Sequence, residues 1–181
     1  MRRSLPILLM LLVLAAPAEA STLGQRTLER GDRGDDVVTL QRVLALKGYR
    51  VGGADGVFGR RTKVVVKRFQ HRRRLKADGR VGPATTRALA RTWGVRTATY
   101  YGPGLYGNRT ACGKVLRHRT RGVAHRSLPC GARVPVYRNG RIAIFPVIDR
   151  GPHTRGVQLD LTHAAARKLR MRTTSVVRAG Y

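Results

Sequence analysis

Acidic residues are scarce in this sequence. Only 9 Asp and Glu stand against 37 Lys and Arg, which gives a formal net charge of +28. The shares of hydrophobic residues (42%) and charged residues (25%) are ordinary, so the chain is expected to fold rather than remain disordered. The excess of cations predicts an anionic partner.

Long hydrophobic runs are also lacking, apart from one at residues 5–16 that is too short to span a bilayer. Arg2 and Arg3 precede this run and Ala18-Glu19-Ala20 follows it, so residues 1–20 read as a secretory signal peptide. The absence of later apolar runs excludes a multi-span membrane protein. The residue directly after the predicted cleavage site is Ser21 rather than a cysteine, which excludes a lipid anchor there. We therefore expect an exported protein without stable membrane insertion.

The chain has only two cysteines, Cys112 and Cys130. In an exported protein they are predicted to form a disulfide rather than a metal site or a catalytic thiol. His118, His153 and His163 are separated in the sequence and lie near arginines, so no metal and no other cofactor is expected.

An internal repeat occupies the first half of the chain. The segment ADGVFGRRT at 54–62 recurs 23 residues later as ADGRVGPAT at 77–85. Each copy combines a tight turn with the residues that begin a helix. We interpret Asp55, Gly56, Asp78 and Gly79 as turn formers rather than ligand contacts.

Apolar residues recur three to four positions apart in three places around this repeat, which predicts three short amphipathic helices. They are Val37, Leu40 and Leu44, then Val65 and Phe69, then Leu89 and Trp93. A small helical bundle over residues 26–93 is expected.

The same region resembles the three-helix type of peptidoglycan-binding domain. The resemblance rests on LERGDRG at 28–34, on Leu40-Gln41, and on both DGxxGxxT segments. It implies a three-helix bundle that binds peptidoglycan. We interpret Gln41 and Gln70 as surface or packing residues of the helices.

After Trp93 the sequence changes to a pattern of strands and turns. Strands are predicted at Thr97–Tyr101, Arg133–Tyr137, Arg141–Ile148 and Thr174–Arg178, with a hairpin turn at Asn139-Gly140. Asp160-Leu161-Thr162 is predicted to cap a helix that follows at 164–169. The result is a compact, mostly β domain over residues 97–181.

Acid–base chemistry in this second domain has two candidate carboxylates, Asp149 and Asp160, among 16 Lys and Arg. We interpret Asp160 as the cap of the predicted helix. Asp149 ends a predicted strand, from which a side chain can project into a cleft. A salt bridge or a turn cap is the equally open alternative for Asp149.

Four ordered blocks in this domain resemble the double-psi β-barrel of the rare lipoprotein A family: YYGPG at 100–104, TACG at 110–113, VAHRSLPCG at 123–131 and VIDRGP at 147–152. The resemblance implies a six-stranded barrel, and a two-domain α + β chain overall. Lytic transglycosylases of this family cleave peptidoglycan glycan strands that lack stem peptides, and the related expansins act on wall polysaccharides. The family's activity-critical carboxylate and histidine correspond to Asp149 and His125.

One departure from the family pattern leaves two functions open. Lys114 stands where catalytic members have a glutamate. A lytic transglycosylase can work with one carboxyl, which first donates and then accepts a proton, so Asp149 is predicted to suffice. Hydrolysis needs a second carboxylate and is not expected if Asp160 is a helix cap. The alternative is a non-catalytic, expansin-like protein that loosens the wall, in which Lys114 pairs with Asp149.

The remaining expectations concern the substrate and its surroundings. Tyr100 and Tyr101 point to opposite faces of a strand, so one of them is predicted to stack on sugar rings. Together with Lys114 and Arg150 they are the predicted substrate-binding residues. The expected partners of this secreted, wall-associated monomer, extracellular or periplasmic, are peptidoglycan glycan strands and anionic wall polymers. Nucleic acid is not expected, because no basic groove with aromatic platforms is indicated.

Overall fold

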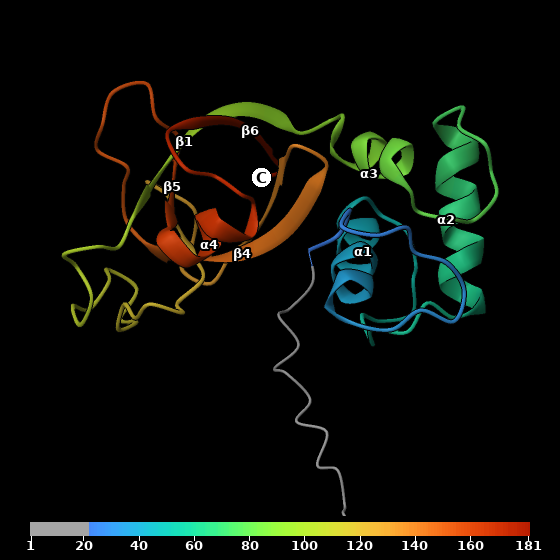
Figure 1. Ribbon diagram of the computed structural model, residues 1–181, viewed down its shortest axis with the longest axis horizontal. Coiled ribbons are helices and arrows are strands. Elements are labelled where there is room, and N and C mark those ends of the chain that lie inside the picture. The colour runs from blue at the N-terminus through green and yellow to red at the C-terminus, as the bar shows by residue number, and fades with distance from the viewer. Residues whose placement is uncertain (1–21) are drawn as a thin grey trace, which may run out of the picture.

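The computed structural model describes residues 22–181, in two parts that pack side by side (Figure 1). Helices α1 to α3 form the first part and the β-strands the second. The predicted signal peptide, residues 1–20, lies outside the described residues. Among the described residues, no helix is both long enough and apolar enough to cross a membrane.

The first part is the predicted three-helix bundle. Its helices are α1 (Asp35–Leu46), α2 (Arg60–Arg72) and α3 (Pro83–Ala90). Leu40, Phe58 and Phe69 are fully buried in its core. Trp93 was predicted to belong to the third helix, but α3 ends three residues before it. Trp93 still packs into this core at 9% exposure, just before β1 begins.

Gln41 explains why the first copy of the repeat forms a fixed turn. Its buried amide donates to Asp55 Oδ1 at 2.7 Å, to the Val57 carbonyl at 3.0 Å and to Thr62 Oγ1 at 3.3 Å. Its carbonyl oxygen accepts the Gly56 N–H at 3.0 Å. Both polar ends of a buried side chain are thus satisfied, as burial requires.

Gln70 makes the same set of bonds in the second copy. Its amide donates to Asp78 Oδ1 at 3.0 Å, to the Arg80 carbonyl at 2.7 Å and to Thr85 Oγ1 at 3.2 Å, and it accepts the Gly79 N–H at 2.9 Å. Both glycines of the DG pairs have positive φ, 76° at Gly56 and 77° at Gly79, which glycine adopts without strain. The prediction of turn formers is confirmed, and the glutamines are packing residues.

The second part is a closed six-stranded barrel with the strand order β1-β5-β2-β4-β3-β6. The strands are β1 (Gly94–Tyr101), β2 (Val123–Ala124), β3 (Arg133–Arg138), β4 (Arg141–Asp149), β5 (Leu159–Thr162) and β6 (Ser175–Ala179). Parallel pairs, β1 with β5 and β2 with β4, combine with antiparallel pairs. Buried residues such as Ala98, Leu159 and Val177 fill the barrel. The predicted fold class, a helical bundle followed by a double-psi β-barrel, is confirmed.

The predicted hairpin is present, and its turn has positive φ at Asn139 (45°) and Gly140 (80°). One prediction is wrong. Asp160 does not cap a helix, because it lies inside β5, where it pairs with Thr99 of β1. The cap of α4 (His163–Lys168) is Thr162, whose hydroxyl accepts the Ala165 N–H at 3.3 Å.

The two parts are joined by more than the linker between α3 and β1. Leu23 and Ile142 exchange backbone hydrogen bonds of 3.1 and 2.9 Å, so the start of the described chain pairs with β4. The Ile142 side chain is fully buried in the core of the helical part, although its backbone belongs to the barrel. This shared packing fixes the helices against one side of the barrel.

Candidate active site

Two carboxylates lie in one row across the barrel, at Asp149 of β4 and Asp160 of β5. Both residues pair with Ala124 of β2, one on each side. A shift of register between Val123 and Ala124 places Asp149, rather than Ile148, opposite Ala124. Two strand spacings separate the two backbones, which is about 10 Å. The structure therefore brings together the only two carboxylates that the second domain has.

Asp149 is oriented by backbone groups rather than by cations. Its Oδ1 accepts the N–H of Ala111 at 2.8 Å and the N–H of Arg150 at 2.9 Å. Both of these backbone bonds go to Oδ1, and the Tyr101 hydroxyl is the side-chain group of the described residues that interacts with this carboxyl. This geometry holds the half-buried carboxyl in place and leaves one oxygen available to a substrate.

Asp160 has a more enclosed carboxyl, and Thr99 Oγ1 donates a hydrogen bond of 2.8 Å to its Oδ1. Burial raises the pKa of Asp160 and the negative charge of Asp149 adds to this, while the bond from Thr99 lowers it. Burial has the largest effect, so the net shift of the Asp160 pKa is upward. The sequence analysis assigned Asp160 to a helix cap, although the alternation of apolar Leu159 and Leu161 with Asp160 is typical of a strand.

Tyr101 is the member of the tyrosine pair that faces the carboxylates. Thr99 and Tyr101 lie two residues apart in β1 and share a face of the strand. The Tyr101 hydroxyl is enclosed and has no hydrogen-bond partner within the described part of the chain. Burial raises its pKa, and the charges of Asp149 and Asp160 raise it further. A direct interaction between the hydroxyl and the Asp149 carboxyl, too poorly aligned to be a full hydrogen bond, adds a smaller rise.

Tyr100 points the other way, against the barrel core. Its hydroxyl donates to the Arg172 carbonyl at 3.1 Å, and its ring stacks on His163 with 5.6 Å between centroids. Of the two tyrosines predicted to bind substrate, Tyr100 therefore has a packing role. Tyr101 is the one placed near the predicted chemistry.

His125 lies beside the row and holds a turn. Its backbone N–H donates to the Asp149 backbone carbonyl at 3.2 Å. Its ring Nδ1 accepts the backbone N–H groups of Ser127 (3.2 Å) and Leu128 (3.0 Å). Burial lowers the pKa of His125 and nearby arginines, Arg150 first among them, lower it further. A neutral ring with its proton on Nε2 fits these bonds.

Arg150 binds the loop at 125–130 rather than the carboxylate beside it. Its guanidinium donates to the Leu128 carbonyl at 3.0 Å and contacts Cys130 Sγ at 3.4 Å. The predicted disulfide between Cys112 and Cys130 is present, with 5.7 Å between the Cα atoms. The disulfide joins this loop to the segment that contains Ala111, whose N–H orients Asp149.

Lys114 makes no ion pair in the described residues, and neither carboxylate of the row has a cation within 4.0 Å. Lys114 is exposed, and its backbone closes a turn with Thr110 through bonds of 2.8 and 3.2 Å. The pairing of Lys114 with Asp149 is therefore not formed, while Lys114 still stands where catalytic members of the family have a glutamate.

A metal centre has no support in the part of the chain that is described. Residues 22–181 contain no group of three or more His, Cys, Asp or Glu placed to hold a metal ion. The arrangement instead offers a carboxyl held by backbone groups at one oxygen, a second carboxyl with a raised pKa, and an enclosed phenol. Such a set can move a proton to and from an oxygen atom of a bound substrate.

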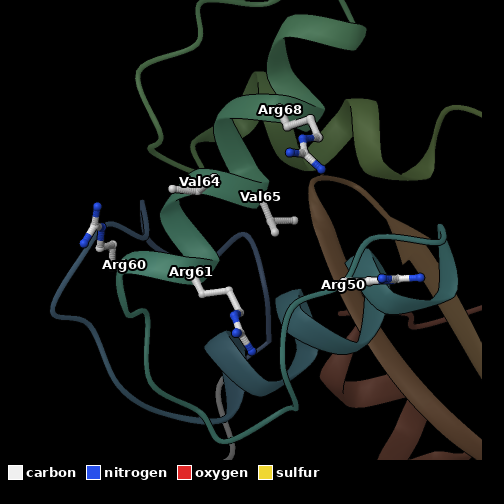
Figure 2. A pocket seen from close by; sticks show the side chains of 6 residues that line it. All are labelled: Arg50, Arg60, Arg61, Val64, Val65 and Arg68. Carbon is white, nitrogen blue, oxygen red and sulfur yellow. The ribbon is translucent and has the colours of Figure 1, made fainter.

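A second feature is a cationic groove of about 430 Å³ on the helical part (Figure 2). It is lined by Arg50, Arg60, Arg61, Val64, Val65 and Arg68. Figure 2 shows the three arginines of α2 spread along that helix rather than converging on one point. The sequence of α2 contains no Asp or Glu, so no acidic neighbour on this helix balances these charges.

Comparisons with known proteins match the two parts separately. Residues 33–89 match the family described as "Putative peptidoglycan binding domain", and residues 96–181 match the family described as "Lytic transglycolase".

Curated relatives match parts of the chain. A "Probable endolytic peptidoglycan transglycosylase RlpA" of Synechocystis is 42% identical over 44% of this chain and 25% of the relative. A protein of the same name from Aquifex aeolicus is 43% identical over 44% of this chain and 36% of the relative. A spore cortex-lytic enzyme of Bacillus subtilis is 43% identical over 38% of this chain and 23% of the relative. The matches thus span about a quarter to a third of these relatives.

The order of the elements agrees with both family matches: the three helices fall within or next to the first, and all strands of the closed barrel overlap the second. The chain is an RlpA-like double-psi β-barrel protein with an N-terminal domain of the peptidoglycan-binding family.

Proposed function

We propose that this protein binds peptidoglycan and cleaves its glycan strands as a lytic transglycosylase, with Asp149 as the catalytic acid and base. The observation that carries the proposal is the state of the Asp149 carboxyl. Backbone N–H groups fix Oδ1, no cation of the described residues is paired with the carboxyl, and no backbone bond goes to Oδ2. The match of residues 96–181 to the lytic transglycolase family supports the same reaction.

The reaction needs one proton that leaves Asp149 and returns. In the first step the proton moves from Oδ2 to the glycosidic oxygen while the bond from that oxygen to C1 of the sugar breaks. The 6-hydroxyl oxygen of the same sugar then bonds to C1, and its proton passes to Oδ2. The product is a 1,6-anhydro sugar, no water is consumed, and Asp149 is restored.

Asp160 and Tyr101 support this chemistry through their surroundings. The charge of Asp149 adds to the burial that raises the pKa of Asp160, so the second carboxyl of the row is ionised less readily than an exposed aspartate. Tyr101 adds a hydroxyl beside Asp149 that becomes available as a donor to a bound sugar. Because Asp160 lies in the row, a hydrolysis that uses both carboxyls is the competing reaction that an experiment must distinguish.

The helical part and its charge favour retention at the wall. The match of residues 33–89 to peptidoglycan-binding domains supports binding of the same polymer. The arginine groove on α2 supports additional contact with anionic wall polymers, since guanidinium groups pair well with phosphate and carboxylate. We infer that the protein acts outside the cytoplasm, where these polymers are found.

The test is release of soluble fragments from purified peptidoglycan by the full chain. Asp149→Asn should abolish release while retaining binding to the wall. Asp35→Asn is the matched control, because Asp35 is exposed on α1, far along the chain from the barrel row. Release by Asp149→Asn at the unmodified rate would refute the role of Asp149. Absence of release by the unmodified protein, despite firm binding, would favour the non-catalytic alternative.

A further inference from the structure

A groove of about 520 Å³ runs between the helical part and the barrel. The helical side contributes Lys47, Arg73 and Trp93, and the barrel side contributes Pro135 and Tyr181 among others. Ligand sites often form where two domains meet, because both can supply recognition groups. No Asp or Glu lines this groove.

Lys47 is held in the groove without a carboxylate partner. Its Nζ donates to Thr92 Oγ1 at 3.1 Å and lies 5.3 Å from the centre of the Trp93 ring. Neither contact neutralises the charge. Burial lowers the pKa of Lys47, and the positive charge of Arg73 lowers it further. Two cations are thus placed together, one of them partly desolvated, at an electrostatic cost.

The helix ends show how the fold tolerates this arrangement. Lys47 and Arg73 are the C-terminal cap residues of α1 and α2. The C-terminal end of a helix carries partial negative charge, which favours nearby cations. This effect is modest, however, and two donor groups of the Lys47 ammonium have no hydrogen-bond partner among the described residues. An anion entering the groove would complete their hydrogen bonds.

The groove also reaches the candidate active site. The Tyr181 ring lies 4.7 Å from the His125 ring, measured between centroids, in an edge-to-face contact. His125 in turn bonds the backbone of Asp149 and directly follows Ala124 of the carboxylate row. Arg96 adds a further cation near Tyr181, with its Nε 2.9 Å from the tyrosine hydroxyl. A glycan strand whose scissile glycosidic bond lies at Asp149 can therefore extend past Tyr181 into the groove.

We propose that this groove is an anion subsite in which Lys47 and Arg73 bind a carboxylate of the peptidoglycan strand while the scissile bond lies at Asp149. The inference rests on the proposed function for the identity of the polymer. Carboxylate is the acidic group of peptidoglycan, and it has two sources: the lactyl group of a sugar without a stem peptide, and the stem peptide itself. Lys47 and Arg73 suit the carboxylate, and the aromatic rings that line the groove, Trp93 and Tyr181, suit the sugar or peptide that carries it.

Binding measurements test this subsite independently of cleavage. The full chain, as Lys47→Met and as unmodified protein, is titrated with soluble peptide-free glycan strands, with peptide-bearing strands and with neutral chitin oligosaccharides. Loss of a charge-assisted bond should weaken binding of a carboxylate-bearing strand by about tenfold. Affinity for the neutral oligosaccharide should not change. A loss of affinity confined to peptide-free strands or to peptide-bearing strands identifies the source of the carboxylate.

Three further variants separate charge from structure. Lys67→Met removes an exposed lysine of α2 that does not line the groove and should bind strands as the unmodified protein does. Lys47→Arg should restore most of the affinity. Arg73→Gln should weaken strand binding in the same direction, which keeps the test valid if Lys47→Met folds poorly. Unchanged strand affinity in both Lys47→Met and Arg73→Gln, or an equal loss for neutral oligosaccharides, would overturn the proposal.

The outcome does not depend on whether the enzyme cuts. If the unmodified protein releases no product but Lys47→Met still loses affinity for the acidic strand, the subsite stands and the cleavage proposal fails. If product is released and the variants bind strands normally, the cleavage proposal stands and the subsite fails.

Discussion

Tyr101→Phe should make the protein more stable, although it removes a polar group near the site. The Tyr101 hydroxyl is enclosed without a hydrogen-bond partner in the described residues. A buried polar group left unsatisfied costs about 1–3 kcal/mol. Phenylalanine keeps the ring and removes this cost together with the weak interaction between the hydroxyl and the Asp149 carboxyl, so the free energy of unfolding should rise by about 1 kcal/mol.

The neighbouring tyrosine provides a control of opposite sign. Tyr100 donates a hydrogen bond of 3.1 Å to the Arg172 carbonyl, so Tyr100→Phe should lower the free energy of unfolding by about 0.5–1.5 kcal/mol. Urea and thermal denaturation measure both variants, with a midpoint shift of about 2–4 °C per kcal/mol for a chain of this size. A Tyr101→Phe variant that is less stable than the unmodified protein would refute the reasoning. Glycan release by Tyr101→Phe should be slower than by the unmodified protein, because the Tyr101 hydroxyl is no longer available to the sugar.

Three other variants test other parts of the structure. Asp160→Asn should raise stability at neutral pH, since the folded state disfavours ionised Asp160. The unmodified protein should lose stability relative to this variant as pH rises from the ordinary pKa of aspartate through the raised pKa. Urea titrations measure the difference in the free energy of unfolding, and a difference that grows toward low pH would contradict this prediction. Replacing Cys112 and Cys130 by Ser opens a loop of 18 residues and should cost roughly 3 kcal/mol in chain entropy, measured by urea denaturation against the oxidised unmodified protein. Reduced unmodified protein should be about as stable as the variant, and equal stability of the oxidised protein and the variant would count against this prediction. Gln70→Leu leaves the Gly79 N–H without its partner and should cost about 1–3 kcal/mol, and a neutral effect in the same assay would show that the turn holds without it.

The helical part could be predicted closely because its signals are local. The repeat of Asp-Gly turns and the spacing of apolar residues fixed where α1, α2 and α3 would form. The role of Gln41 and Gln70 as the centres of both turns depends on contacts between residues up to 21 positions apart, as from Gln41 to Thr62. Such contacts have no local signature, so the glutamines were predicted only as surface or packing residues.

The barrel shows what local signals cannot provide. The hairpin of β3 and β4 was predicted from Asn139-Gly140, whereas β2 has two residues and exists only because its neighbours pair with it. Asp160 was taken for a helix cap because Asp is a favoured cap and a helix does follow. Register across β4, β2 and β5 then places it in one row with Asp149. Asp149 could be predicted from its sequence block, and its partner could not.

The central claim is an intramolecular transfer at Asp149, and its most direct test is the chemistry of the new glycan ends. The full chain is incubated with peptidoglycan in water enriched in oxygen-18, and the soluble products are analysed by mass spectrometry. The account predicts 1,6-anhydro ends without the heavy isotope, and no products from Asp149→Asn. Reducing ends that carry oxygen-18 would contradict it, since they would show that water attacks the sugar and that the two carboxyls act as a hydrolytic pair.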